Sequence, residues 1–127
     1  MVLIDTNIVL RFLLQDHETL SLQAKDIIDN HITICLNAVL YEVIHVLQSV
    51  YQIDRQRIAD KLLVLFENSI IESENTQVTI KALTIFKETS LDFMDCLLLA
   101  YHIVDNDAIY SFDKKVNNYL KRVNGEI

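Results

Sequence analysis

Two aspartates directly follow short apolar runs that are typical of buried parallel strands. Residues 2–4 form an aliphatic run that ends at Asp5, and residues 108–112 form a run that ends at Asp113. Ligand sites in open parallel sheets form beyond the carboxyl ends of the strands. If these two strands are neighbours, both carboxylates lie at one edge of the sheet. Each aspartate is equally well placed to be an ordinary N-cap of the helix that follows it.

A third aspartate, Asp95, lies in a helical stretch that is apolar nearly all the way round. Such a helix is expected in the middle of a packed structure. Leu98 and Leu99 flank Asp95 at helical spacing, and His102 lies one turn further on. A buried carboxylate without a partner costs several kcal/mol, so Asp95 needs a hydrogen-bond network, His102 or a bound cation. Of these three partners we favour the cation.

Two further acids are ambiguous from their positions alone. Asp92 lies three residues before Asp95 on nearly the same helix face, so it either joins Asp95 at a metal ion or caps the helix. The start of the periodic pattern at Asp92 favours the cap. Glu42 lies at the border between a polar and an apolar helix face. A solvated glutamate is the simpler interpretation there.

Several carboxylates in one pocket would repel each other by about 4 kcal/mol per pair at 4 Å and an effective dielectric near 20. Such a cluster needs protons or a metal ion. Oxygen ligands suit Mg²⁺ or Mn²⁺, and the absence of a Cys/His pair at zinc spacing argues against zinc. Hard ions held by few carboxylates accept phosphate oxygens, which is the arrangement of metal-assisted phosphodiester hydrolysis.

The composition of the 127 residues indicates one globular domain, residues 1–127, because 51% are hydrophobic and 23% charged. One glycine and no proline exclude the glycine-rich dinucleotide and phosphate loops. A formal charge of −7 argues against nonspecific electrostatic binding of nucleic acid. The N-terminus is unlike a signal peptide and no apolar run could span a membrane, so we expect a cytoplasmic protein. Cys35 and Cys96 are expected to be buried thiols.

The hydrophobic periodicity predicts strands that alternate with one or two helices, and therefore an α/β sandwich with a mostly parallel sheet. The predicted strands are residues 2–4, 31–36, 69–73 and 108–112. The first predicted helix begins at residue 6. The other predicted helices cover about 18–29, 38–52, 55–66, 75–87, 92–104 and 114–122. Asn37 is a predicted N-cap. The chain ends with residues 124–127 soon after the last helix, which leaves little room for a fifth edge strand.

Four segments of the chain together resemble the PIN domain, and most closely the VapC-like toxin ribonucleases of prokaryotic toxin–antitoxin pairs. In chain order they are VLIDTNIVLRFLLQD, LNAVLYEVIHVL, SLDFMDCLLLAY and AIYSFDKKV. The resemblance covers essentially the whole chain. It implies a three-layer α/β/α sandwich around a central, mostly parallel sheet of four or five strands.

The same resemblance implies an endoribonuclease that depends on Mg²⁺ or Mn²⁺. Carried over by motif, the metal-binding and catalytic acids are Asp5, Glu42, Asp95 and Asp113, with Asp92 as a secondary ligand. The supporting polar residues are Thr6, Asn7 and Ser111. The implied partners are an RNA substrate, a second copy in a homodimer, and a small antitoxin whose tail enters the acidic groove.

Few basic residues lie near the implied site, and other functions remain possible. The nearest basic residues in sequence are Arg11, Lys114 and Lys115, whereas Arg55, Arg57 and Lys61 are expected on a solvated helix face. One alternative is a weak or inactive module whose acidic pocket serves mainly to bind an antitoxin. Receiver domains and haloacid-dehalogenase-like phosphatases fit poorly, because the first motif is Asp-Thr-Asn rather than an acidic pair or DxD. Cleavage of DNA stays open.

Overall fold

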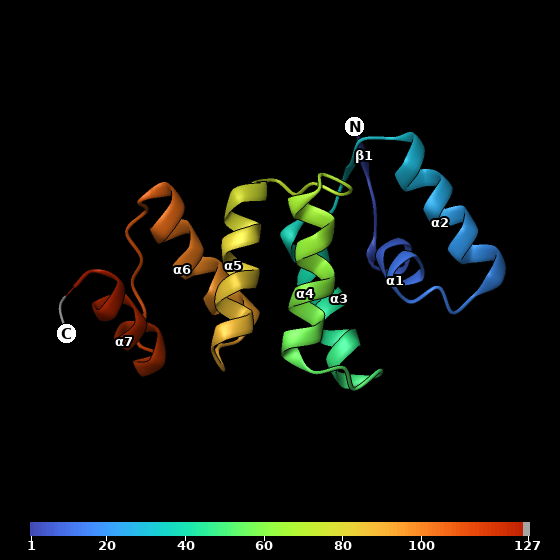
Figure 1. The fold of residues 1–127 in the computed structure, drawn as a ribbon. Helices are drawn as coiled ribbons and strands as arrows, with labels where there is room; N and C mark the ends of the chain where they lie inside the picture. The colour runs from blue at the N-terminus through green and yellow to red at the C-terminus, as the bar shows by residue number, and fades with distance from the viewer. Residues whose placement is uncertain (126–127) are drawn as a thin grey trace.

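The computed structural model describes residues 1–125, most of which are helical (Figure 1). The elements are β1 (Val2–Leu3), α1 (Thr6–Leu14), α2 (Glu18–Asn30), β2 (Thr33–Ile34), α3 (Asn37–Ser49), α4 (Arg55–Glu67), α5 (Thr76–Glu88), α6 (Phe93–Asp105) and α7 (Lys114–Val123). All the helices predicted from periodicity are present within a few residues of their expected bounds. One cap differs: Asn37 is the first residue of α3 and Leu36 is its N-cap, because the Asn37 side chain accepts a hydrogen bond from Thr79 instead.

The sheet of the described residues is small and parallel. The N–H groups of Val2 and Ile4 in and after β1 donate to the carbonyl oxygens of Ile32 and Ile34 at 2.8 and 3.0 Å. On the other side of β2, Glu72 forms a single parallel bridge with Ile34. The strand predicted at 69–73 is therefore reduced to one bridge, and β2 lies between it and β1.

The strand predicted at residues 108–112 is wrong for this structure. These residues have no regular structure, and the side chains of Tyr110 and Phe112 are 96% and 109% exposed. A strand forms only where a neighbouring strand satisfies its N–H and C=O groups, and no strand pairs with this segment within residues 1–125. The expected sheet of four or five strands thus stays a prediction. Residues 126 and 127, part of the tail in which we expected no fifth strand, lie outside the described residues.

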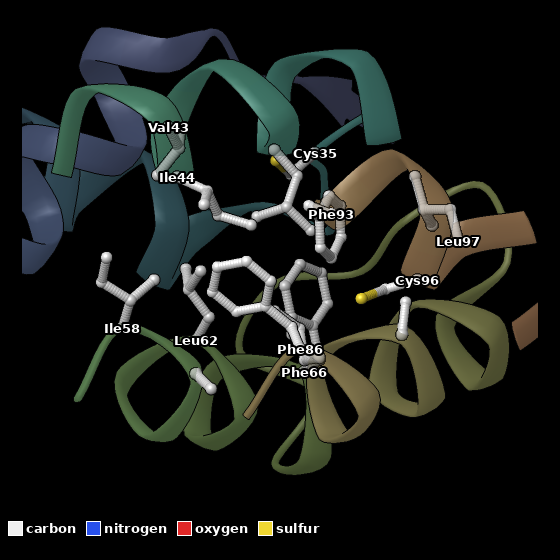
Figure 2. Close-up of a cluster of buried hydrophobic side chains, with 14 of the residues drawn as sticks. Cys35, Val43, Ile44, Ile58, Leu62, Phe66, Phe86, Phe93, Cys96 and Leu97 are labelled. Carbon is white, nitrogen blue, oxygen red and sulfur yellow. The ribbon is translucent and has the colours of Figure 1, made fainter. Parts of the chain in front are cut away.

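The hydrophobic core lies between α3 and the start of α6 on one side and α4 and α5 on the other (Figure 2). At its centre the rings of Phe86 and Phe93 meet edge to face, with centroids 6.0 Å apart and planes at 83°. Cys35 and Cys96 are buried, free thiols, as predicted. Burial raises the pKa of each thiol to about 12, so both are unreactive near neutral pH.

Helix α6 is less enclosed than its apolar sequence predicts. Phe93, Cys96 and Leu99 are buried on the side that packs on α5, whereas Met94 and Leu98 are 49% and 41% exposed. The reason is visible in the arrangement of the elements: α1 and α2 lie at one end of the molecule and α6 and α7 at the other, with α3 and α4 between them (Figure 1). No helix within residues 1–125 is long and apolar enough to cross a membrane.

Candidate active site

Three aspartates gather at the starts of α6 and α7. Asp92 is the N-cap of α6, where its Oδ1 accepts from the N–H of Met94 at 3.2 Å. Asp113 is the N-cap of α7, where its Oδ1 accepts from the N–H groups of Lys115 and Val116 at 2.8 and 3.1 Å. Asp95 lies in the first turn of α6. The predicted capping roles of Asp92 and Asp113 are confirmed, and each cap uses Oδ1.

Asp95 is half-buried, and its carboxylate has no hydrogen bond or ion pair with any residue among 1–125. Burial raises its pKa most, and the negative charges of Asp113 and Asp92 raise it further. His102 is not its partner. The His102 ring is hydrogen-bonded to the carbonyl oxygen of Asp107 and to the side-chain oxygen of Asn124, at 2.9 and 3.1 Å. These two acceptors raise the pKa of His102.

Asp5 and Glu42 lie away from this group. Asp5 is the exposed N-cap of α1, where its Oδ1 accepts from the N–H of Ile8 at 3.1 Å. Glu42 is exposed on α3. Helix α1 lies on the other side of α3 and α4 from α6 and α7 (Figure 1), and neither acid contributes to the pKa of Asp95. Within one chain, the structure therefore brings together Asp92, Asp95 and Asp113 and leaves Asp5 and Glu42 apart from them.

These acids do not form a metal centre within one chain. Nowhere in residues 1–125 do three Asp, Glu, His or Cys side chains lie close enough together to share an ion. Carboxylate oxygens are the right donors for Mg²⁺ or Mn²⁺. Mg²⁺ and Mn²⁺ need ligand oxygens at about 2 Å, whereas repulsion between carboxylates acts over longer distances. The raised pKa of Asp95 therefore does not require that the three acids lie close enough to share an ion. The chemistry of the donors fits a hard divalent ion, but their arrangement in a single chain does not.

The three predicted supporting residues divide in the same way. Thr6 and Asn7 are in the first turn of α1, next to Asp5, where Thr6 is half-buried and Asn7 exposed. Ser111 lies near Asp113, whose N–H donates to the Ser111 hydroxyl at 2.9 Å. The Ser111 carbonyl oxygen also accepts from the side chain of Asn117 at 2.8 Å, so Ser111 ties the loop before Asp113 to α7.

Arg55 is not on a solvated helix face, contrary to the prediction. Its guanidinium donates to the carbonyl oxygen of Phe86 at 3.0 and 3.1 Å and to that of Leu91, and it lies 3.8 Å from the centre of the Phe86 ring. Burial lowers its pKa, and the charge of Asp92 partly opposes this. No pattern in the sequence distinguishes Arg55 from its neighbour Arg57, because the carbonyl groups that Arg55 binds belong to a distant part of the chain.

Arg55 and Asp92 line a cleft of about 310 Å³ that the sequence did not reveal. Its other lining residues are Tyr41, Ile44, His45, Gln48, Phe86, Ser90 and Phe93. The cleft borders the three aspartates through Asp92. It is lined by both polar and apolar side chains from α3, α4 and the α5–α6 turn, and so it could receive a ligand beside the acids.

Among the basic residues predicted near the site, Lys114 and Lys115 follow Asp113 in the first turn of α7. Lys114 is exposed, and the ammonium group of Lys115 lies 3.5 Å from the Ser90 hydroxyl. Arg11 is instead held on α1 by a 2.8 Å ion pair with Asp16. The positive charge beside Asp113 therefore comes from the two lysines.

Comparison with known proteins matches residues 2–124 to the PIN domain family. The chain belongs to the PIN domain family. The PIN domain is generally a nuclease fold, and its members usually use divalent metals. No curated protein and no solved structure matches this PIN domain. The match extends over all four of the motifs that suggested the family, and it includes each of the acids discussed above.

Proposed function

We propose that this PIN domain is an endoribonuclease that depends on Mg²⁺ or Mn²⁺ and acts as the toxin of a toxin–antitoxin pair. The observation that carries the proposal is the half-buried Asp95 carboxylate, which has no partner within residues 1–125 and faces repulsion from Asp92 and Asp113. In a nuclease fold, an arrangement that raises the free energy of an ionised carboxylate points to a functional group rather than a structural one. Asp5 and Glu42 are the remaining acids of the proposed site.

The surroundings of Asp113 support a substrate that carries phosphate. Lys114 and Lys115 present their ammonium groups at the start of α7, directly after Asp113. Ammonium groups bind phosphate oxygens as point charges. Tyr41 is the exposed aromatic residue in the lining of the cleft beside Asp92, and aromatic rings are the surfaces on which unpaired RNA bases stack. These features favour single-stranded RNA as the substrate.

The test is to incubate the purified chain with total RNA in the presence of Mg²⁺, Mn²⁺ or EDTA. Asp5→Asn and Asp95→Asn are the test variants, and Asp107→Asn removes a charge from an exposed position as the matched control. We expect cleavage with either metal, none with EDTA, and a loss of at least about 100-fold in both test variants but not in the control. Cleavage that persists with EDTA, or in both test variants, would contradict the proposal. A single-stranded DNA of the same sequence tests the choice of sugar.

A second candidate function follows from the absence of a three-acid metal centre within residues 1–125. The acidic surface around Asp95 and Asp113 could mainly dock the basic tail of an antitoxin, with negligible catalysis. In that case a basic peptide binds wild-type protein and the Asp95→Asn variant binds it more weakly, while neither cuts RNA with any metal. Copurification with a small basic polypeptide supports the toxin role under either function and therefore does not choose between the two functions. The cleavage assay makes that choice.

A further inference from the structure

The cleft beside Asp92 has an apolar floor and a polar edge. Its volume is about 310 Å³. Ile44, Phe86 and Phe93 line it and belong to the buried core, so they form the floor (Figure 2). Binding sites for small organic groups usually combine such an apolar surface with a few polar side chains that fix the orientation of the ligand. The polar side chains of this cleft therefore indicate which ligand it accepts.

The side of the cleft formed by α3 carries three polar side chains that are free to bind a ligand. Tyr41, His45 and Gln48 lie four and three residues apart, so they share one face of the helix. All three are exposed, and their side chains form no hydrogen bond with any residue among 1–125. Unpaired RNA bases stack on aromatic rings such as that of Tyr41 and form hydrogen bonds through their edges. The composition of this side suits a base.

Arg55 and Asp92 carry opposite charges in the same cleft but do not pair with each other. Arg55 donates through Nε and Nη2 to the carbonyl oxygens of Phe86 and Leu91, so both N–H groups of Nη1 remain free. Asp92 caps α6 through Oδ1, and its Oδ2 remains free. Burial lowers the pKa of Arg55 and the charge of Asp92 partly raises it, so the two groups are close. The three ion pairs within residues 1–125 nevertheless do not include them.

A ligand between these two groups must donate to a carboxylate and accept from a guanidinium. Among the RNA bases, guanine has the matching edge. Its N1–H and N2–H₂ groups are adjacent donors, and its O6 beside them is an acceptor. Uracil presents one donor between two acceptors, so an acceptor oxygen would face the carboxylate. Adenine and cytosine offer one amino group beside an acceptor ring nitrogen, so they cannot donate to both carboxylate oxygens.

We propose that this cleft is a binding pocket for one guanine base of single-stranded RNA, in which Asp92 accepts from N1–H and N2–H₂, Arg55 donates to O6 and Tyr41 stacks on the ring. Charge-assisted hydrogen bonds of this kind are the strong ones, and their pattern selects the base. Binding of guanine to the cleft does not depend on the proposed nuclease function.

The position of the pocket also gives it a role in the choice of the cleaved bond, and this role rests on the proposed nuclease function. Ser90 lines the cleft, and its hydroxyl lies 3.5 Å from the ammonium group of Lys115, which is placed to bind a phosphate next to the base. Asp95 follows Asp92 by three residues, about one turn of α6. A guanine in the cleft therefore brings a neighbouring phosphodiester toward the acids.

Binding without cleavage tests the pocket by itself. Four labelled RNA octamers consist of uridine with G, A, C or U at one central position, and each is titrated in EDTA by fluorescence anisotropy. We expect the wild-type chain to bind the G octamer about tenfold more tightly than the other three. Equal binding of the four octamers, or a preference for another base, would overturn the proposal.

Asp92→Asn separates the base contact from the helix cap. Asparagine still caps α6, but it replaces one acceptor oxygen with an NH₂ group that opposes an N–H group of guanine. The preference for the G octamer should fall to within about twofold. Asp107→Asn, exposed and outside the lining of the cleft, is the matched control and should keep the preference. A preference that survives in a folded Asp92→Asn variant, as checked by urea denaturation, would overturn the assigned contact.

Tyr41→Ala tests the stacking surface. Loss of the ring should weaken binding of the G octamer by about fivefold or more. Tyr110→Ala removes an almost fully exposed tyrosine outside the cleft and should leave the affinity unchanged. Equal affinities of the two variants would mean that the base does not stack on Tyr41.

Amide chemical shifts locate the bound base. With the G octamer, the amides of residues 41–48 and 90–93 should shift, whereas those of α2 should not. Shifts that spare the cleft would place the RNA elsewhere and overturn the proposal. Shifts of the cleft amides with a short basic peptide, and none with RNA, would mean that a protein partner occupies the cleft instead.

Cleavage mapping separates this proposal from the nuclease proposal. If the chain cuts total RNA, the fragment ends should show G enriched at one fixed position, and Asp92→Asn should lose this enrichment whereas Asp107→Asn keeps it. Cleavage without enrichment for G would overturn the role of the pocket in choosing the bond. If the wild-type chain cuts no RNA but still prefers the G octamer, the nuclease proposal fails and the guanine pocket stands.

Discussion

At the residue scale, Asp5, Asp92 and Asp113 share one property: each accepts a backbone hydrogen bond at a helix start through Oδ1. The sequence predicted these caps, because an aspartate directly before a helical pattern is a standard N-cap. It could not separate capping from ligand binding, since one carboxylate can do both with its two oxygens. Asparagine and alanine variants separate them, because asparagine also caps a helix whereas alanine does not.

For Asp5 we expect the two substitutions to differ in stability and agree in activity. Asp5→Asn keeps an oxygen for the N–H of Ile8, so its free energy of unfolding should lie within a few tenths of a kcal/mol of wild type. Asp5→Ala loses the cap and should cost about 1 kcal/mol. Urea denaturation measures both, and the RNA cleavage assay should show both inactive. An active Asp5→Asn variant would show that Asp5 serves only as a cap.

Asp95 should be a residue that lowers stability at neutral pH. Its pKa is raised in the folded protein, so the folded chain binds this proton more tightly than the unfolded chain does. This contribution favours folding at low pH and is lost as the pH rises through the raised pKa. Asp95→Asn should therefore raise the free energy of unfolding at pH 7, and the gain should shrink as the pH is lowered through the raised pKa of Asp95.

Denaturation curves at several pH values check this, with Asp107→Asn as the exposed control. A variant that is less stable than wild type at pH 7 would mean that the Asp95 carboxylate has a stabilising partner after all. A gain that does not change with pH would mean that the effect is unrelated to the ionisation of Asp95.

At the scale of elements, every helix was predictable but only some of the strands were, for a physical reason. A helix satisfies its hydrogen bonds within itself, so the periodicity of Arg55–Glu67 or Thr76–Glu88 is enough to locate it. A strand needs a pairing strand, and the local sequence does not determine which segment that will be. Residues 2–3 found one in β2, whereas residues 108–112 have strand composition but no pairing strand within residues 1–125. The prediction that α6 is enclosed on all sides failed for the same reason, because the composition of a helix does not say which element will cover Leu98.

Arg55 connects α4 to the end of α5 and to the turn before α6, so its replacement should lower the free energy of unfolding. Its fork binds the carbonyl oxygens of Phe86 near the end of α5 and of Leu91 before α6. Lysine keeps the charge but loses the Nε–H bond to the Phe86 carbonyl oxygen and the flat guanidinium that lies over the Phe86 ring, so Arg55→Lys should lower the free energy of unfolding by about 1–3 kcal/mol. Arg57→Lys, two residues along the helix at an exposed position, should change it by less than about 0.5 kcal/mol. Equal effects of the two substitutions in urea denaturation would contradict this role for Arg55.

At the scale of the whole molecule, the net charge of −7 governs how RNA can bind. A chain with this charge repels a polyanion at long range, so attraction must come from a few local cations. The structure supplies Lys114 and Lys115 beside Asp113, while Arg11 is paired with Asp16 and Lys87 with Asp60. RNA affinity in the absence of divalent ions should therefore depend only weakly on salt.

Two phosphate contacts to single-stranded RNA predict a slope of about −1.4 in a plot of log affinity against log salt concentration. Fluorescence anisotropy with a labelled RNA and the Asp5→Asn variant, which should not cut it, measures this slope. Lys114→Ala and Lys115→Ala should each reduce its magnitude by about 0.7 and weaken binding to all sequences alike. Lys61→Ala, on α4, is the matched control and should leave the slope unchanged. A much steeper slope, or one that Lys61→Ala reduces as strongly, would place the RNA on a different face of the molecule.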